Sequence, residues 1–164
     1  MEDFILMLRS FSIRTLVDIR RFPGSAKHPQ FNREHLQMAL QAAGIGYVHL
    51  EELGGRRKAE KNSKNSRWRN SSFRGYADHM GTEGFQHAVQ ELERIGEAGP
   101  TAYMCSEAVW WRCHRSMVSD HLKAQGWTVL HIMVTGKAEE HPYTAPARIV
   151  SGRVLYSDED LFNQ

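Results

Sequence analysis

The chain lacks several features that would define a specialised class of protein. Of its 164 residues only two are cysteine and five are proline, and its longest apolar run is a few residues. A helix needs about 20 apolar residues to cross a bilayer, which excludes a membrane-spanning segment. The N-terminal MEDFILMLRSFSI carries two acids in its first three residues and lacks the basic-then-apolar pattern of a secretory signal. We therefore expect a cytoplasmic protein with no membrane partner, whose thiols are free, metal-bound or catalytic and not joined in a structural disulfide.

Composition predicts one soluble globular domain over residues 1–164, since 41% of the residues are hydrophobic and 24% are charged. The net charge of +2 conceals an uneven distribution. Residues 56–74 hold eight basic residues and one acid, a local charge of +7, so the remainder of the chain sums to −5.

Strand-like and helix-like segments alternate along the chain. Helical spacing of apolar residues predicts helices over 2–11, 32–43, 82–96 and 113–125, with a short helix or turn over 73–80. Short runs rich in β-branched and aromatic residues predict strands over 15–20, 47–50, 101–105 and 127–134. The alternation is typical of βαβ units, so we predict a three-layer α/β domain with a mostly parallel sheet. A turn at Ser151-Gly152 predicts a small C-terminal β-hairpin, followed by an acidic end that forms a last helical turn.

Residues 56–72 have no hydrophobic period and are rich in Asn and Ser, which predicts a basic, mobile surface loop. Trp68 and, just beyond the loop, Phe73 lie among the basic residues. Aromatic and basic side chains together can stack on bases while neutralising phosphates, so nucleic acid is one partner the stretch indicates. The alternative is a solvated loop that keeps the protein soluble.

The most informative stretch is TAYMCSEAVWWRCHRSMVSDHL, a strand-to-helix junction that contains both cysteines. A helix N-terminus and a nearby arginine lower a thiol pKa, so Cys105 or Cys113 could be a nucleophile with His114 or Glu107 as acid or base. The same residues could bind zinc, but they fall short of four well-placed ligands, and we predict no metal. A reversible disulfide is a third interpretation. The fourth is structural, with two buried thiols and an ion pair between Glu107 and Arg115.

Polar residues follow three predicted strands of the sheet. Loops at the carboxyl ends of parallel strands lie side by side, so these residues should meet at one edge and form an anion site for a phosphate-bearing ligand. We expect one concave pocket lined by Asp18, Arg20, Gly55, Arg56, Cys105, Glu107 and Arg115. Each motif also has a structural interpretation: a buried Asp18–Arg20 pair, an ordinary loop at residues 53–57, and a core position for His131.

Six ordered motifs resemble the bacterial and archaeal family called domain of unknown function 488: VDIRRFPGS, PQFN, YVHLEELGGRR, FRGYADHM, MCSEAVWWRCHR and HPYTAPARIV. The resemblance implies a Rossmann-like domain and brings no established reaction. It selects as catalytic candidates Cys105, Glu107, Cys113 and His114. As candidates for substrate or anion binding it selects Asp18, Arg20, Glu52, Gly54, Gly55, Arg74, Tyr76 and Arg115, to which the physical argument adds Arg56; the family pattern also includes Pro23 and Phe31.

One departure from the family pattern concerns the first strand. Relatives usually begin with an extra strand that ends in an Ile-Gly-His-Ser-like segment, whereas this sequence starts at the helix that follows it. We therefore expect an exposed edge or a gap in the sheet. If that histidine serves the site, this copy is impaired.

Two classes of function remain open from the sequence. One is an enzyme that acts on a nucleotide or nucleic acid through the Cys/Glu/His junction. The other is a non-catalytic nucleotide or nucleic-acid binding module in which the junction is structural. The sequence specifies no cofactor.

Overall fold

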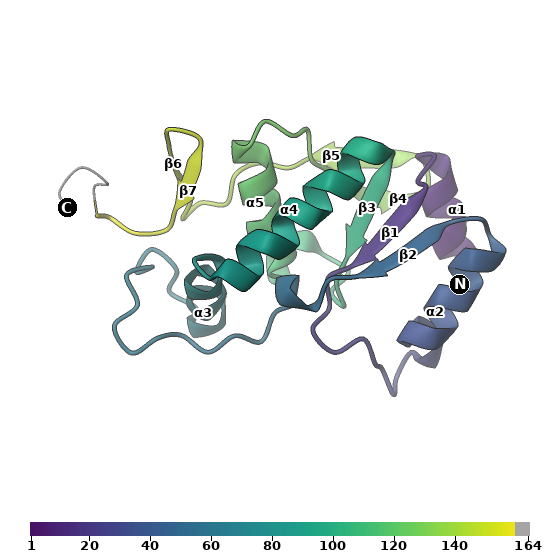
Figure 1. Cartoon of the computed structure of the whole chain (residues 1–164), viewed down its shortest axis with the longest axis horizontal. Coiled ribbons are helices and arrows are strands. Elements are labelled where there is room, and N and C mark those ends of the chain that lie inside the picture. Colours follow the sequence, from purple (N-terminus) through teal and green to yellow (C-terminus); the bar gives the residue numbers. More distant parts are fainter. Residues whose placement is uncertain (160–164) are drawn as a thin grey trace.

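A computed structural model describes residues 1–159 of the chain and shows a mixed α/β fold built on a short parallel sheet (Figure 1). Within these residues the sheet has three strands, β1 (Thr15–Asp18), β2 (Gly46–His49) and β3 (Thr101–Met104), in the order β2-β1-β3. Thr15 is in register with Gly46 on one side and with Thr101 on the other. Three carboxyl ends therefore meet at one edge, as the sequence predicts.

The helices agree closely with the hydrophobic periods. They are α1 (Glu2–Ser10), α2 (Arg33–Ala42), α3 (Ser71–Met80), α4 (Glu83–Ala98) and α5 (Arg115–Ala124). Single 3₁₀ turns lie at η1 (Pro29–Phe31), η2 (Glu51–Leu53) and η3 (Trp110–Arg112). Thr82 caps α4 by accepting a hydrogen bond from the Phe85 backbone N–H, whereas the Asn32 side chain binds the Ser25 N–H instead of capping α2.

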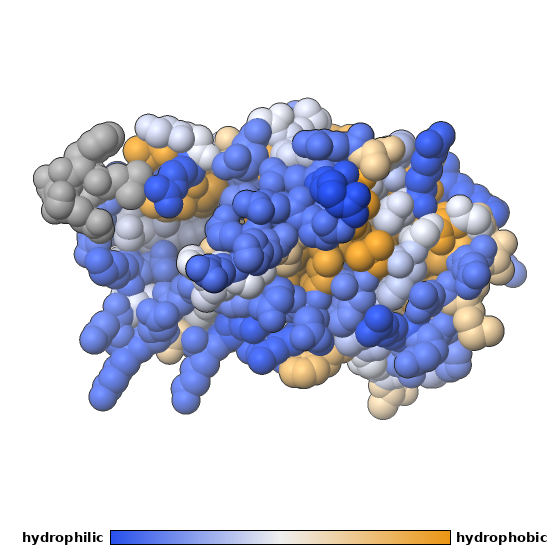
Figure 2. Space-filling model, in the orientation of Figure 1, coloured by the Kyte–Doolittle hydropathy of each residue, from blue (hydrophilic) through white to orange (hydrophobic). Residues whose placement is uncertain are grey.

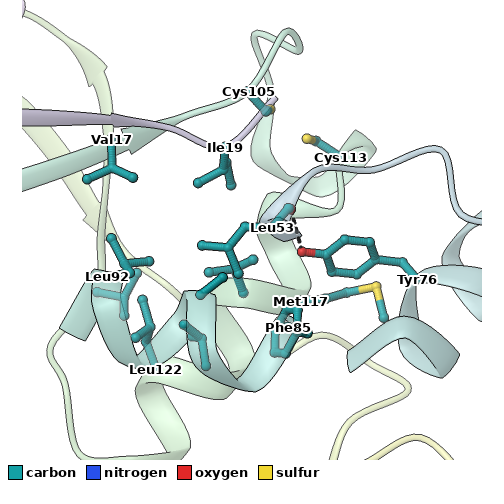
Figure 3. Packing of buried hydrophobic residues seen from close by; sticks show 14 of the residues in the cluster. Val17, Ile19, Leu53, Tyr76, Phe85, Leu92, Cys105, Cys113, Met117 and Leu122 are labelled. Atoms are coloured by element: carbon teal, nitrogen blue, oxygen red, sulfur yellow. Dashed lines mark hydrogen bonds between the residues drawn. The ribbon is translucent and has the colours of Figure 1, made fainter. Parts of the chain in front are cut away.

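Alternation along β1 places successive residues on opposite faces of the sheet. Leu16 packs in a cluster with apolar residues of α1 and α2, including Leu8 and Leu36. Val17 and Ile19 belong to the larger cluster formed with α3, α4 and α5, shown in Figure 3. Helices therefore contact both faces of β1, which explains why Leu16 and Val17 are both buried although they point to opposite faces.

The prediction that the fourth strand joins the parallel sheet is wrong. β4 (Leu130–Val134) pairs antiparallel with β5 (Lys137–Glu140), a strand that the sequence analysis missed. Gly136, with φ of 74°, turns the chain back directly after β4, and a tight turn of this kind joins antiparallel neighbours. The sheet is therefore smaller than the mostly parallel one we predicted.

The C-terminal hairpin is confirmed as β6 (Arg148–Val150) and β7 (Arg153–Leu155), joined through Ser151 and Gly152, both at positive φ. The last helical turn predicted for the acidic end extends beyond residue 159, outside the described residues. None of the helices formed by residues 1–159 is both long and apolar enough to cross a membrane.

β3 has a strand partner on one side only. It pairs with β1, and no strand of residues 1–159 is hydrogen-bonded to its other edge. A cavity runs along that edge between β3, α1 and β4. The carboxyl end of β3 leads directly to the loop that contains Cys105.

Candidate functional site

A cavity of about 830 Å³ lies beside β3 and extends past its carboxyl end. Four of the seven residues expected to line one pocket do so: Arg20, Cys105, Glu107 and Arg115. Asp18, Gly55 and Arg56 lie elsewhere. The predicted site therefore divides into a part that faces the cavity and a part that supports the loops around it.

Cys105 follows β3 directly and is 5% exposed. Its Sγ accepts a hydrogen bond from the Glu107 backbone N–H at 3.4 Å, and the Cys113 side chain points toward it (Figure 3). The interaction with the Cys113 thiol lowers the pKa of Cys105 to about 7, although burial opposes the shift; Arg115 and the Glu107 N–H also favour the thiolate. These interactions favour the thiolate form of Cys105.

Cys113 has the opposite character. Its interaction with Cys105 and its burial raise its pKa above the ordinary value. Its Sγ lies 3.3 Å from His114 Nδ1, while His114 Nε2 lies 3.2 Å from the carbonyl oxygen of Ile19. Because a carbonyl only accepts, His114 carries its proton on Nε2 and offers Nδ1 as an acceptor. The single S–H of Cys113 can thus be donated to Cys105 or to His114.

His114 is held as a neutral imidazole. Burial lowers its pKa to about 4. Its ring packs against Tyr76, with centroids 4.9 Å apart, and Gly55 leaves the space it occupies, since a Cβ on Gly55 would lie 2.7 Å from His114 Nδ1. His114 therefore supports the junction from inside, and it is not among the residues that line the cavity.

Arg115 begins α5 and reaches back over the Cys105 loop. Its guanidinium donates to the carbonyl oxygens of Glu107, at 3.4 Å, and Ala108, at 3.5 Å. Within residues 1–159 the Glu107 carboxylate forms no ion pair, so the structural interpretation of a Glu107–Arg115 pair is wrong. The Arg115 Nε is buried and has no hydrogen-bond partner within the same residues.

Asp18 and Arg20 form the buried pair that the sequence offered as one interpretation. Arg20 Nε and Nη2 donate to the two Asp18 oxygens at 2.8 and 2.7 Å, and Tyr47 donates to Asp18 Oδ2 at 2.6 Å. Burial disfavours the charge on Arg20, but the hydrogen bonds and charge of Asp18 outweigh it and raise the Arg20 pKa. His49 Nε2 lies 2.7 Å from the Arg20 carbonyl oxygen and helps to hold the turn.

The loop after β2 packs its backbone closely against neighbouring segments. A Cβ on Gly54 would lie 2.5 Å from the backbone of Arg21, so only glycine fits at this position. Arg56, at φ of 59°, accepts a hydrogen bond at its carbonyl oxygen from Arg21. The Glu52 carboxylate is exposed and lies 3.8 Å from His79. None of these side chains reaches the cavity.

Two further predicted binding residues hold neighbouring carbonyl groups. Tyr76 is 1% exposed and donates to the carbonyl oxygen of Leu53 at 2.7 Å (Figure 3). Arg74 donates to the carbonyl oxygens of Trp68 and Arg69. Both residues thus stabilise the fold around the basic stretch, away from the cavity.

The aromatic residues of the basic stretch are partly buried and pack against the larger hydrophobic cluster. The Trp68 ring lies 4.9 Å from Phe73 and 5.7 Å from Tyr156, between ring centroids. Arg67 donates to the carbonyl oxygen of Pro146, and Asp78 accepts from the Glu60 backbone N–H. The predicted mobility of residues 56–72 stays a prediction, but Trp68 and Phe73 are not free platforms for stacking bases.

A second polar network was not identified from the sequence. Asp120 is fully buried in α5 and binds His141, which in turn binds His131. One signal could have revealed it: Asp120 lies on the apolar face of α5 with Met117, where a charged residue needs a partner. His131 is 6% exposed, which agrees with its predicted core position, yet it also lines the cavity.

The described residues contain no group of three or more His, Cys, Asp or Glu side chains arranged to hold a metal ion. A family model for the domain of unknown function DUF488 matches residues 1–122. The chain therefore belongs to this family, as its motifs suggested. The match includes the Cys105 junction and Asp120 and ends before β4. No curated protein and no solved structure matches the chain.

Proposed function

We propose that the protein is an enzyme that acts on an anionic, phosphate-bearing substrate through the thiolate of Cys105. The observation that carries the proposal is the position of Cys105. It lies at the carboxyl end of β3 on the wall of the cavity, accepts a backbone N–H, and has a second thiol beside it. The raised pKa of Cys113 keeps its proton in place beside the Cys105 thiolate.

Arg115 supports an anionic substrate. It lines the cavity, and its Nε is buried without a partner among residues 1–159. A buried donor left without an acceptor costs about 1–3 kcal/mol, which a ligand oxygen would offset. Arg20 lines the same wall, but its charge is paired with Asp18 through two hydrogen bonds. The anion therefore binds chiefly through Arg115 and the first turn of α5.

The arrangement resembles Rossmann-like domains in one respect that matters for function. In open α/β sheets, ligands bind outside the carboxyl ends of the strands. The proposal places the substrate at this edge, over β3 and the start of α5, and it does not require the fourth parallel strand.

The test is the pH dependence of alkylation by iodoacetamide, followed for each cysteine by mass spectrometry. Cys105 should react with a midpoint near pH 7, while Cys113 stays slow to well above pH 9. In Cys113→Ser the Cys105 midpoint should rise toward the ordinary thiol value of about 8.5. Urea-unfolded protein, in which both thiols titrate normally, is the control. A Cys105 midpoint near 8.5 in the folded wild type would refute the proposal.

The anion is tested in the same assay with inorganic phosphate as the probe. Phosphate should slow alkylation of Cys105 at constant ionic strength, and Arg115→Gln should abolish this protection. Arg94→Gln, on the surface of α4, is a matched control that should leave it intact. Equal protection by phosphate in Arg115→Gln would show that the anion binds elsewhere.

A second candidate function is non-catalytic binding of a nucleotide or nucleic acid. The observation in its favour is that residues 56–72 keep several exposed basic side chains, among them Arg56, Lys58 and Lys61. The surface at the lower left of Figure 2, where α3 and the segment before it lie in Figure 1, is mostly hydrophilic. Because the Trp68 ring packs against Phe73 and Tyr156, binding would depend chiefly on phosphate contacts. Affinity for single-stranded DNA should then fall with salt, with a log-log slope of roughly −3 for four or five phosphates. Unchanged binding after Lys58, Lys61 and Arg69 are replaced by alanine would contradict it.

A further inference from the structure

Three side chains form a continuous hydrogen-bonded chain from α5 to the cavity wall. Asp120 Oδ1 lies 2.8 Å from His141 Nε2, and His141 Nδ1 lies 2.8 Å from His131 Nε2. The three residues are 0%, 1% and 6% exposed. The chain connects α5 with β4 and with the segment after β5, so the tertiary fold is what assembles it.

The donors around Asp120 determine which nitrogen atoms carry protons. Its carboxylate accepts the Thr144 N–H and hydroxyl at 2.9 and 2.5 Å and the Tyr156 hydroxyl at 2.7 Å. An ionised carboxylate only accepts, so His141 carries its proton on Nε2 and its Nδ1 accepts from His131. His131 is then protonated on Nε2, and its Nδ1 keeps a lone pair.

The surroundings of His131 hold the ring rigidly. Trp110 stacks on it with centroids 4.7 Å apart and an interplanar angle of 5°, and meets His141 edge-on at 5.0 Å. Burial lowers the pKa of His131 to about 3, and the nearby His141 and Arg115 act in the same direction. The imidazole is therefore neutral in the resting protein and keeps a lone pair on Nδ1; with so low a pKa it is a weak base that holds a proton only transiently.

His131 and Cys105 share one cavity and one cation. Both line the cavity together with Trp110 and Arg115. The charge of Arg115 lowers the pKa of Cys105 as well as that of His131, and Trp110 begins the 3₁₀ turn at the end of the Cys105 loop. Within residues 1–159, His131 Nδ1 has no hydrogen-bond partner, which leaves it available to a ligand.

We propose that His131 is the proton-accepting group of the Cys105 cavity, and that His141 and Asp120 are positioning residues that fix its tautomer and stabilise the proton it receives. The inference rests on the proposed function, because it assigns a base to the chemistry of Cys105. Asp120 has no cation beside it within residues 1–159, so a proton received by the histidine pair would be stabilised by a buried, uncompensated carboxylate.

The probe is p-nitrophenyl acetate, with which both steps balance. The Cys105 thiolate bonds to the carbonyl carbon, the bond to p-nitrophenolate breaks, and an acetyl thioester remains. Water then bonds to the same carbon and gives one proton to His131 Nδ1, the C–S bond breaks with its electron pair going to sulfur, and acetic acid and the thiolate are released. His131 returns its proton to solvent. The burst of p-nitrophenolate reports the first step and steady turnover the second.

His131→Gln should preserve the burst and slow deacylation by about 10-fold, less than the usual contribution of a general base because the low pKa of His131 makes it a weak one. The solvent deuterium isotope effect on deacylation should be normal in the wild type and absent in His131→Gln. A purely structural role would not remove the isotope effect. His87→Gln, on the exposed side of α4, is the control and should match the wild type in both steps.

Asp120→Asn removes the carboxylate charge while keeping the hydrogen bond that fixes the tautomer of the two histidines. The Thr144 N–H can only donate, whereas the hydroxyls of Thr144 and Tyr156 can rotate and accept, so the amide oxygen should stay toward His141. Nitrogen chemical shifts should therefore show His131 protonated on Nε2 in both proteins, while deacylation falls with the loss of charge. Asp3→Asn, on exposed α1, controls for charge alone.

The outcomes distinguish the two proposals. A burst that persists in Cys105→Ser would refute the nucleophile, and with it the base assigned to it. A burst that requires Cys105, with deacylation unchanged in His131→Gln, would refute only the role of His131. Protonation of His131 on Nδ1 in the folded wild type would also overturn the inference, because that nitrogen could not accept a proton.

Discussion

Asp18 and Asp120 are both fully buried, but they have different partners. Asp18 binds a guanidinium through two hydrogen bonds, and the Arg20 pKa is raised, so no proton moves in this pair. Asp120 binds an imidazole, a backbone N–H and two hydroxyls, and no arginine or lysine pairs with it within residues 1–159. A buried carboxylate that faces arginine can only anchor the fold, whereas one that faces histidine can also support proton transfer.

The largest expected effect is a loss of stability on removing Asp18, the carboxylate that is paired with arginine. Asp18→Ala should lower the free energy of unfolding by about 3–5 kcal/mol, because it leaves the Arg20 charge buried and unpaired. Asp120→Ala should cost about 2–3 kcal/mol, since it leaves only neutral donors, two of which can rotate. Urea unfolding measures both. Replacing Asp18 by leucine and Arg20 by methionine together should recover most of the loss, and equal losses in the two alanine variants would break the comparison.

The next largest effect is a pH dependence of the free energy of unfolding, which arises from the buried histidines. The folded pKa of His131 is about 3 and that of His114 about 4, both below the ordinary 6.5, with burial as the main cause. The unfolded chain then binds more protons, so stability is complete above pH 6.5 and is lost as pH falls. For His131 alone the loss is about 2 kcal/mol between pH 6.5 and 5.

Urea unfolding at several pH values measures this slope. His131→Gln and His114→Gln should each reduce it. Leu40→Ala, in the core cluster on the other face of the sheet, removes no titratable group and should lower stability while keeping the slope. A flat profile in the wild type would show that neither histidine resists protonation in the folded state.

The smallest effect comes from the two tyrosines that donate to these carboxylates. Tyr47→Phe removes a hydrogen bond from an aspartate already paired with arginine and should cost about 1 kcal/mol. Tyr156→Phe removes one from an aspartate without a cation and should cost about 2 kcal/mol. Thermal unfolding of both variants gives the order. A larger loss in Tyr47→Phe than in Tyr156→Phe would mean that the charge of Asp120 is better stabilised than its neighbouring groups indicate.

Much of the local structure was predictable because it depends on short segments. The periodicity of α4, its Thr82 cap and the Ser151-Gly152 hairpin each follow from a few neighbouring residues. β4 was assigned to the wrong partner because a strand's own residues specify its extended conformation and not the edge it pairs with. β5, KAEE, was missed because it is polar, and it is a strand only through pairing with β4.

The candidate site was predictable in part, for a related reason. The positions of Cys105, Glu107 and Arg115 depend on a single junction, so the sequence located them together. Trp68 was interpreted as a stacking surface from its basic neighbours, yet Tyr156, far along the chain, covers it. The family pattern includes Gly55 and Tyr76 among the binding candidates, and in the fold Gly55 makes room for His114 while Tyr76 holds the Leu53 carbonyl group.

The sequence by itself determined the helices, the three strands of the parallel sheet and the family. It also determined the junction in which Cys105 follows a strand and Arg115 begins a helix. These features depend on residues within one or two turns of each other. Only the tertiary structure decided that Cys105 and Cys113 take opposite pKa shifts and that Asp120, His141 and His131 form one chain. Such features depend on distances between segments far apart in sequence and on the water that packing removes from between them.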